Sequence, residues 1–167
     1  MRLNNLSDID FNKKLNKIRI FMFDLDGVLL KNSEDKENIY QQMAEFSNAL
    51  KNDERFTGII TAREGDELTT RLDEMENCFV ITSSLSKEKV MEKRLIELGM
   101  NCENLFYIGD DILDLPLLHK AGISCAPSNA RREVKRAVDI ILNEDESCNI
   151  LDTVLQLSRE KTKNNII

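Results

Sequence analysis

The chain has 167 residues and a formal net charge of −7, with 23 Lys and Arg residues against 30 Asp and Glu residues. This length suffices for one domain that buries roughly two thirds of its unfolded surface, so neither a disulfide nor a metal is needed merely to fold it. The acidic balance argues against a broad nucleic-acid-binding surface, and the sequence has no apolar run of about 18 residues that could cross a membrane.

The N-terminal segment 1–17 mixes polar and apolar residues without the hydrophobic stretch of a signal peptide, which indicates a cytoplasmic protein. The four cysteines have no C-x-x-C pair and no metal-ligand spacing, so they indicate reduced thiols. We expect a single domain over residues 1–167, in which 1–17 and 160–167 are peripheral.

In chain order, the first strong signal lies in residues 19–29, where a mostly apolar run leads into Asp24, Asp26 and Gly27. This pattern predicts a buried strand with an acidic carboxyl end. We expect further strands at 56–61, 78–82, 105–108, 123–126 and 138–142, and helices at 33–51, 66–76, 86–98, 112–120, 130–137 and 147–157. The repeated βα units predict an α/β protein with a three-layer, Rossmann-like fold and a mainly parallel central sheet.

Polar residues gather at the expected carboxyl ends of these strands. Asp24 and Asp26 follow the first strand and Thr61 ends the second, while Lys87 opens a helix and Asp110 follows the fourth strand. Parallel strands end at one edge of the sheet, so these side chains should converge. Clustered carboxylates favour Mg²⁺ over zinc, and a cation, an amine and a hydroxyl beside a free carboxylate suit phosphoryl transfer. Taken alone, Asp-x-Asp is more often an acidic turn, and a helix lysine is more often solvated.

Four motifs in this order make the chain resemble the haloacid dehalogenase (HAD) superfamily of phosphohydrolases over nearly its whole length. The matching segments are 23–29, 59–63, Lys87 and 109–114. The resemblance implies a HAD-like fold and Mg²⁺-dependent hydrolysis of a phosphomonoester. It also implies that Asp24 attacks phosphorus to form an aspartyl phosphate, and that Asp26 protonates the leaving alcohol and later takes a proton from water.

The resemblance further implies how the phosphoryl group would be held. Thr61 would donate a hydrogen bond to a phosphoryl oxygen, and Lys87 would pair with both the nucleophile and the phosphoryl charge. Lys89, two residues further along the same helix, is the alternative for this lysine.

The metal would be held, by the same resemblance, by Asp24, Asp110 and the backbone carbonyl of Asp26. Asp111 and Asp114 would lie next to these ligands and would hold Lys87 or a metal-bound water in position. An oxygen site of this kind does not distinguish Mg²⁺ from Mn²⁺ or Co²⁺.

Residues beside the motifs support weaker inferences. Arg63 could contact substrate or phosphate, and a surface ion pair explains it equally well. Asn129 precedes a charged helix and could cap it. The resemblance to the HAD superfamily implies that this loop also lies beside the active site, so Asn129 could do both. Arg131 is most simply solvated. His119 fits a surface or half-buried helix position, which leaves no histidine for a Ser-His or Cys-His mechanism.

HAD enzymes usually select substrates with a cap domain inserted after the first or third strand, and here neither gap is long enough for one. Among capless members the chain is similar to the 3-deoxy-D-manno-octulosonate 8-phosphate phosphatase-like group, mainly through segments 98–111 and 121–126. There are two departures. Segment 31–35 is shorter than the hairpin that helps to form the tetramer of that group, and 143–149 stands where the group has a glycine-rich turn with an arginine.

Three functions remain open on this basis. The first is a phosphatase for a small phosphorylated metabolite such as a sugar or sugar-acid phosphate, with a homo-oligomer left undecided. The second is a phosphatase for a phosphoprotein or nucleic-acid end, although two tyrosines and no tryptophan offer little stacking for nucleic acid. The third is a non-catalytic interaction domain, which the intact set of motif residues disfavours.

Overall fold

The computed structural model describes residues 2–4, 7–31, 36–51, 53–142 and 149–159. Its centre is a seven-stranded sheet in the order β1-β7-β6-β5-β2-β3-β4. The strands are β1 Arg2–Leu3, β2 Ile20–Phe23, β3 Phe56–Ile60, β4 Cys78–Ile81, β5 Leu105–Ile108, β6 Ile123–Pro127 and β7 Ile140–Leu142. All neighbouring pairs are parallel except β1 with β7, so the expected α/β fold with a mainly parallel sheet is confirmed.

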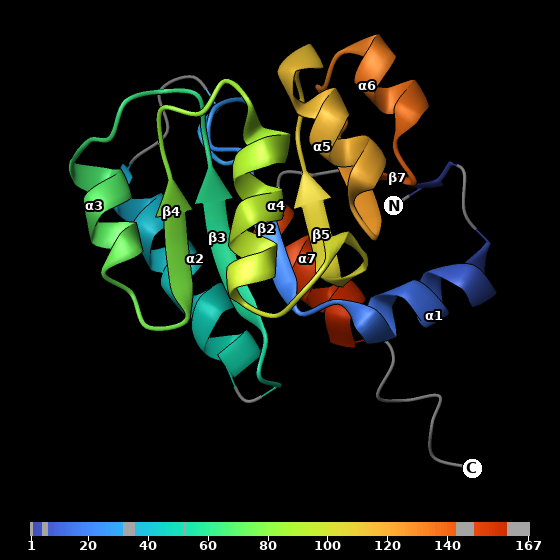
Figure 1. The fold of residues 1–167 in the computed structure, drawn as a ribbon, viewed down its shortest axis with the longest axis horizontal. Coiled ribbons are helices and arrows are strands. Elements are labelled where there is room, and N and C mark those ends of the chain that lie inside the picture. The colour runs from blue at the N-terminus through green and yellow to red at the C-terminus, as the bar shows by residue number, and fades with distance from the viewer. Residues whose placement is uncertain (1, 5–6, 32–35, 52, 143–148, 160–167) are drawn as a thin grey trace.

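Helices cover both faces of this sheet (Figure 1). They are α1 Asp8–Lys17, α2 Lys36–Lys51, α3 Glu67–Asp73, α4 Lys87–Glu97, α5 Leu115–Lys120, α6 Arg132–Ala137 and α7 Ile150–Arg159, with short 3₁₀ helices η1 Cys102–Asn104 and η2 Ile112–Asp114. Buried side chains of α1, α2, α3 and α7 form one core, and those of α4, α5 and α6 form the other. The molecule therefore has three layers.

Strand β2 joins the two cores because its side chains alternate between the faces. Phe21 and Phe23 belong to the first core, whereas Ile20 and Met22 belong to the second. The Phe46 ring of α2 packs edge-on against both phenylalanines, with ring centroids 5.9 and 5.4 Å away. A strand buried on both sides reads as a continuous apolar run, which explains the strength of the sequence signal.

The expectation that residues 1–17 are peripheral is wrong for α1. Ser7 caps this helix by accepting a hydrogen bond from the Asp10 N–H, and Phe11 and Leu15 are buried in the first core. The spacing of four residues puts both side chains on one helix face, and Ile18 continues the apolar surface. Residues 160–167 lie outside the described part of the chain, as do residues 33–35, with which the expected helix over 33–51 begins, and the segment 143–148.

The expected helix over 112–120 divides at its start. Residues 112–114 form the 3₁₀ helix η2 and α5 begins at Leu115, because Pro116 suits only the first turn of an α-helix. The connections from β2 to α2 and from β4 to α4 span only residues 24–35 and 82–86, so neither holds a cap domain. Among the helices that the structure describes, none is both long and apolar enough to span a membrane.

Candidate active site

Asp24 follows β2 directly and is held there by backbone contacts. Its N–H donates to the Ile108 carbonyl at 2.9 Å, which continues the pairing of β2 with β5. Its Oδ1 accepts a hydrogen bond of 2.8 Å from the Leu25 N–H, and the residue is only 6% exposed. The carboxylate is therefore fixed and nearly excluded from solvent.

The chain turns away from the strand at Gly27, and this turn leaves room for a second carboxylate. Gly27 has a φ of +82°, and a Cβ at this position would lie 2.0 Å from Asp110 Oδ2. Only glycine combines this backbone conformation with so close an approach. The turn after β2 and the loop after β5 thus meet at Gly27 and Asp110.

These loops border an open cavity of about 310 Å³ at the carboxyl edge of the sheet. Its walls are formed by Asp24, Asp26, Gly27, Thr61, Ala62, Lys87, Asp110, Asp111 and Leu113. The structure therefore brings all of the strand-end residues that the sequence singled out into one hollow.

Lys87, the first residue of α4, connects two carboxylates inside this site. Its Nζ lies 2.8 Å from Asp24 Oδ2 and 2.7 Å from Asp114 Oδ1, and its side chain is 3% exposed. Lys89, the alternative on the same helix, is exposed. The buried lysine is thus the one that faces Asp24.

Asp114 is fully buried, and both of its carboxylate oxygens already accept hydrogen bonds. Oδ1 accepts from Lys87 Nζ at 2.7 Å and from the Tyr107 hydroxyl at 2.6 Å. Oδ2 accepts from the N–H groups of Asp110 and Asp111 at 3.0 and 3.1 Å. Asp114 therefore ties the loop after β5 to Lys87.

Asp26 also lines the cavity, and its side chain is exposed to solvent. Thr61 Oγ1 donates to its Oδ2 at 3.4 Å, and Arg63 Nη1 lies 3.2 Å from its Oδ1. Thr61 also accepts a hydrogen bond from the Arg63 N–H, which fixes its hydroxyl near the end of β3. Arg63 is thus paired at the rim of the site with Asp26, and more distantly with Asp66 at 3.8 Å.

The turn before α6 contacts both active-site loops. Asn129 Nδ2 donates to the Gly27 carbonyl at 3.1 Å, and the Arg131 N–H donates to the Asp110 carbonyl at 3.0 Å. Arg131 Nε also donates to Asp111 Oδ2 at 2.8 Å. Two expectations need correction here: the cap residue of α6 is Arg131 rather than Asn129, and Arg131 is ion-paired rather than merely solvated.

Burial and mutual repulsion shift the titration of the carboxylates. Burial and the Asp114 charge raise the pKa of Asp24 to about 7, although Lys87 acts in the opposite direction. Burial and the charges of Asp114 and Asp111 raise the pKa of Asp110 to about 6. Burial opposes the charged form of Lys87, but Asp114 and Asp24 outweigh it and raise the lysine pKa above its usual value. The site therefore holds more negative charge than its one buried lysine balances.

The donor set fits a hard divalent cation. Carboxylate oxygens of Asp24, Asp110 and Asp114 lie within 4.8 Å of one another. Because Asp114 already accepts four hydrogen bonds, Asp24 and Asp110 are the carboxylates that could bind a cation. A cation between them would stabilise the charged form of both carboxylates against the burial and the neighbouring Asp114 charge that raise their pKa values, and oxygen ligands suit Mg²⁺.

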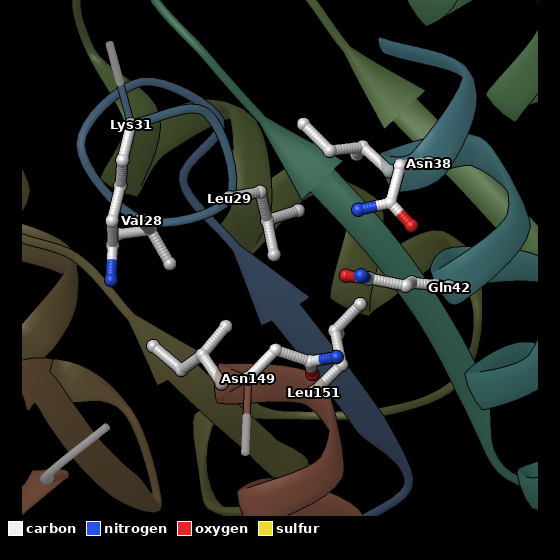
Figure 2. A pocket seen from close by; sticks show the side chains of 9 residues that line it. Val28, Leu29, Lys31, Asn38, Gln42, Asn149 and Leu151 are labelled. Carbon is white, nitrogen blue, oxygen red and sulfur yellow. The ribbon is translucent and has the colours of Figure 1, made fainter. Parts of the chain in front are cut away.

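A second hollow of about 60 Å³ borders the same loop at Val28 and Leu29, between α2 and α7. Figure 2 shows the amides of Asn38, Gln42 and Asn149 facing it beside apolar side chains. The described residues that line it include no carboxylate, and its volume suits only a few water molecules. The cavity at the carboxyl edge of the sheet, which is lined by Asp24, Asp26 and Asp110, is thus the candidate active site.

Sequence reasoning missed Tyr107, the buried donor to Asp114. The available signal was one hydroxyl within the otherwise apolar run Leu105–Ile108. Such a group needs a hydrogen-bond partner when it is buried, but the sequence alone does not say which one.

Comparisons with known proteins identify the family and the fold of the chain. The family model described as haloacid dehalogenase-like hydrolase matches residues 6–153. The 3-deoxy-D-manno-octulosonate 8-phosphate phosphatase of Haemophilus influenzae is 27% identical over 138 residues, which cover 78% of this chain and 77% of that protein. The phosphoglycolate phosphatase of Methanopyrus kandleri is 35% identical over 63 residues, or 38% of this chain and 27% of that protein.

Solved structures show the same fold. The 3-deoxy-D-manno-octulosonate 8-phosphate phosphatase of Moraxella catarrhalis, solved with magnesium, phosphate and KDO, superposes with a TM-score of 0.76. It is 23% identical, and the match covers 91% of each chain. The cobalt-bound enzyme of Haemophilus influenzae superposes with a TM-score of 0.70 at 24% identity, covering 91% of this chain and 95% of that one.

Proposed function

The chain belongs to the haloacid dehalogenase-like hydrolase family, and on this premise we propose that it is a Mg²⁺-dependent phosphomonoesterase acting through an aspartyl-phosphate intermediate. One observation carries the proposal. Asp24, nearly buried, lies 2.8 Å from the Lys87 ammonium and shares an open cavity with Asp26, Thr61 and Asp110. A nucleophile, an acid and a cationic anion-binding group thus meet at one place.

In the first step, a carboxylate oxygen of Asp24 forms a bond to phosphorus while the bond to the ester oxygen breaks. Asp26 gives its proton to the leaving alcohol, for which its exposed position at the cavity wall is suitable. Lys87 remains charged throughout, since its pKa is raised, and it offsets the charge of the transferring phosphoryl group.

In the second step, water attacks phosphorus and Asp26 takes its proton, which releases inorganic phosphate and restores the Asp24 carboxylate. Thr61 donates to a phosphoryl oxygen from the end of β3, and Asn129 keeps the turn at Gly27 in place. Mg²⁺ held by Asp24, Asp110 and the Asp26 carbonyl would neutralise phosphoryl charge, and Asp111 would orient a water near it.

We propose a small phosphorylated metabolite, such as a sugar or sugar-acid phosphate, as the substrate class. Support comes from the relatives that act on 3-deoxy-D-manno-octulosonate 8-phosphate. Both segments in which the sequence departs from that group, 31–35 and 143–149, lie almost wholly outside the described residues. We also propose a single domain in a cytoplasmic protein, in keeping with the free thiols of Cys78, Cys102 and Cys125.

The test is phosphate release from a panel of phosphorylated sugars, sugar acids, nucleotides and phosphopeptides, with Mg²⁺ or with chelator. We expect Mg²⁺-dependent turnover that Asp24→Asn abolishes. Asp53→Asn is the matched control, because Asp53 is exposed and lies near the start of β3, at the other end of the strand from the site. A folded wild-type protein that releases no phosphate from any compound would contradict the proposal, and a preference for phosphopeptides or nucleotides would replace the metabolite.

A further inference from the structure

Tyr107 is a fully buried tyrosine near the carboxyl end of β5, and it has no place in the mechanism above. Its three strand neighbours Leu105, Phe106 and Ile108 are apolar and equally buried. Its hydroxyl donates a hydrogen bond of 2.6 Å to Asp114 Oδ1. A phenylalanine would fill the same space without this donor, so packing alone does not account for the hydroxyl.

The two oxygens of Asp114 are held in different ways. Oδ2 is fixed by two backbone N–H groups of its own loop, whereas within the described part of the chain Oδ1 is held by the side chains of Tyr107 and Lys87. The lysine has a flexible stem and three donors, so it does not define the position of its acceptor. The tyrosine ring is fully buried in the second core, and it therefore supplies the rigid contact to Oδ1.

This oxygen in turn decides where the lysine ammonium lies. Lys87 Nζ is 2.7 Å from Asp114 Oδ1 and 2.8 Å from Asp24 Oδ2, so it lies between the tyrosine-bound carboxylate and the nucleophile. The chain of contacts runs from Tyr107 through Asp114 and Lys87 to Asp24, and each of these side chains is less than a tenth exposed.

We propose that Tyr107 is a positioning residue for phosphoryl transfer: its hydroxyl holds Asp114 Oδ1 where Lys87 can contact Asp24 and the phosphoryl group at once. The inference rests on the proposed function, because it assigns Lys87 to the phosphoryl charge. Burial raises the pKa of the Tyr107 hydroxyl well above its usual value, so the group stays a donor rather than a source of protons. Tyr107 acts through Asp114 and does not itself touch the substrate.

The first experiment compares Tyr107→Phe with Tyr40→Phe, since these are the two tyrosines of the chain. Tyr40 is half-buried on α2, where the Arg71 guanidinium lies 4.0 Å from its ring centroid. With the best substrate of the panel, we expect Tyr107→Phe to lower kcat by about tenfold and to leave KM within about twofold. Tyr40→Phe should change neither constant. A kcat for Tyr107→Phe within about twofold of that for Tyr40→Phe would overturn the proposal.

The second experiment needs neither turnover nor a stable Tyr107→Phe variant. Protein labelled with 3-fluorotyrosine gives two ¹⁹F signals, which Tyr40→Phe assigns. Addition of inorganic phosphate with Mg²⁺ should move the Tyr107 signal and leave the Tyr40 signal in place. The reason is that phosphate attracts the Lys87 ammonium and so changes the contact of Lys87 with Asp114 Oδ1, the oxygen to which Tyr107 donates. An unmoved Tyr107 signal at saturating phosphate would overturn the proposal. A wild type that is inactive on the whole panel would refute the phosphatase function instead, and the ¹⁹F result would still show whether Tyr107 is coupled to the site.

Discussion

Asp110 illustrates the conflict between stability and function at single residues of this site. Its carboxylate is crowded by Asp114 and Asp111 and lies against Gly27, where no side chain would fit. Carboxylates that repel one another destabilise a folded protein unless a cation lies between them. The charges that would bind Mg²⁺ therefore reduce the stability of the metal-free protein.

We expect Asp110→Asn to raise the free energy of unfolding of the metal-free protein near pH 8. Folding raises the pKa of Asp110 from 3.8 to about 6, so the ionised form costs stability. That cost is absent below about pH 4 and grows as the pH rises through 6. After a discount for partial exposure, the gain from the substitution should be about 1 kcal/mol near pH 8 and vanish near pH 4. Urea unfolding in chelator measures it, and an equal gain at both pH values would contradict the prediction.

The same experiment with Mg²⁺ should reverse the order of stability. The wild type should gain stability from the cation, because ligand binding to the folded state shifts the unfolding equilibrium. Asp110→Asn lacks one of the two available carboxylates and should gain little. Comparable stabilisation of both proteins by Mg²⁺ would place the cation elsewhere.

Gly27 and Gly99 allow backbone strain to be separated from damage to the site. Both have positive φ, but a Cβ at Gly27 would meet the Asp110 carboxylate, whereas a Cβ at Gly99 would meet nothing within 4 Å. We expect the positive φ to cost each alanine variant about 1 kcal/mol of stability, and the clash with Asp110 to add to this cost in Gly27→Ala. Only Gly27→Ala should abolish phosphate release and stabilisation by Mg²⁺. If Gly99→Ala also lost activity, the backbone strain rather than the clash with Asp110 would explain the loss of phosphate release in Gly27→Ala.

At the scale of elements, hydrogen bonds between Asp66 and Thr69 fix the start of helix α3. Asp66 Oδ1 accepts a hydrogen bond of 3.0 Å from the Thr69 N–H, and Thr69 Oγ1 accepts one of 2.7 Å from the Asp66 N–H. This reciprocal pair is a capping box. Lys36 Nζ also lies 2.8 Å from Asp66 Oδ2, which links the cap to the start of α2.

We expect Asp66→Ala to lower the free energy of unfolding by about 1 kcal/mol at neutral pH. The Lys36 and Thr69 contacts lower the pKa of Asp66 to about 2, so its stabilising effect is complete above about pH 4 and lost as the pH falls towards 2. The difference between the two proteins should therefore shrink over that range. Asp66→Asn, which keeps the cap but has no charge, should show a smaller loss at neutral pH. Urea titrations at several pH values measure all three.

The elements that could be predicted from sequence are those with a strong internal pattern. The strand at 105–108 was expected and found with the same bounds, because an apolar run buried on both faces is unambiguous. The two-residue strand β1 and helix α1 were not expected, since β1 is too short for any pattern and α1 depends on its contacts with the core.

Some features of the site could likewise be predicted from the sequence, and others could not. Convergence of Asp24, Thr61 and Asp110 follows from parallel strand order, so it could be predicted. The contacts of Tyr107 with Asp114 and of Arg131 with Asp111 depend on side-chain directions across different elements. No single-sequence pattern encodes such directions.

At the scale of the whole molecule, the carboxyl edge of the sheet carries the candidate site, whereas its amino end contributes to stability through α1. The carboxyl edge holds the charged cavity, whereas the core extends to the amino end of β2, where α1 arrives just before Ile20. In Figure 1 helix α1 lies at the end of the strands away from the arrowheads of β3, β4 and β5. Stability supplied by α1 should therefore be separable from catalysis.

Leu15→Ala tests this separation, with Ile9→Ala as its control on the same helix. Leu15 is 1% exposed and Ile9 is 69% exposed. Removing the buried side chain should cost about 2–4 kcal/mol, whereas the exposed one should cost less than about 0.5 kcal/mol. At a temperature where both variants are folded, kcat should match that of the wild type, because Leu15 lies on α1 and is not one of the residues that line the cavity. If Leu15→Ala lost activity while fully folded, the two ends of the sheet would be coupled, and the N-terminal helix would belong to the catalytic apparatus rather than only to the core.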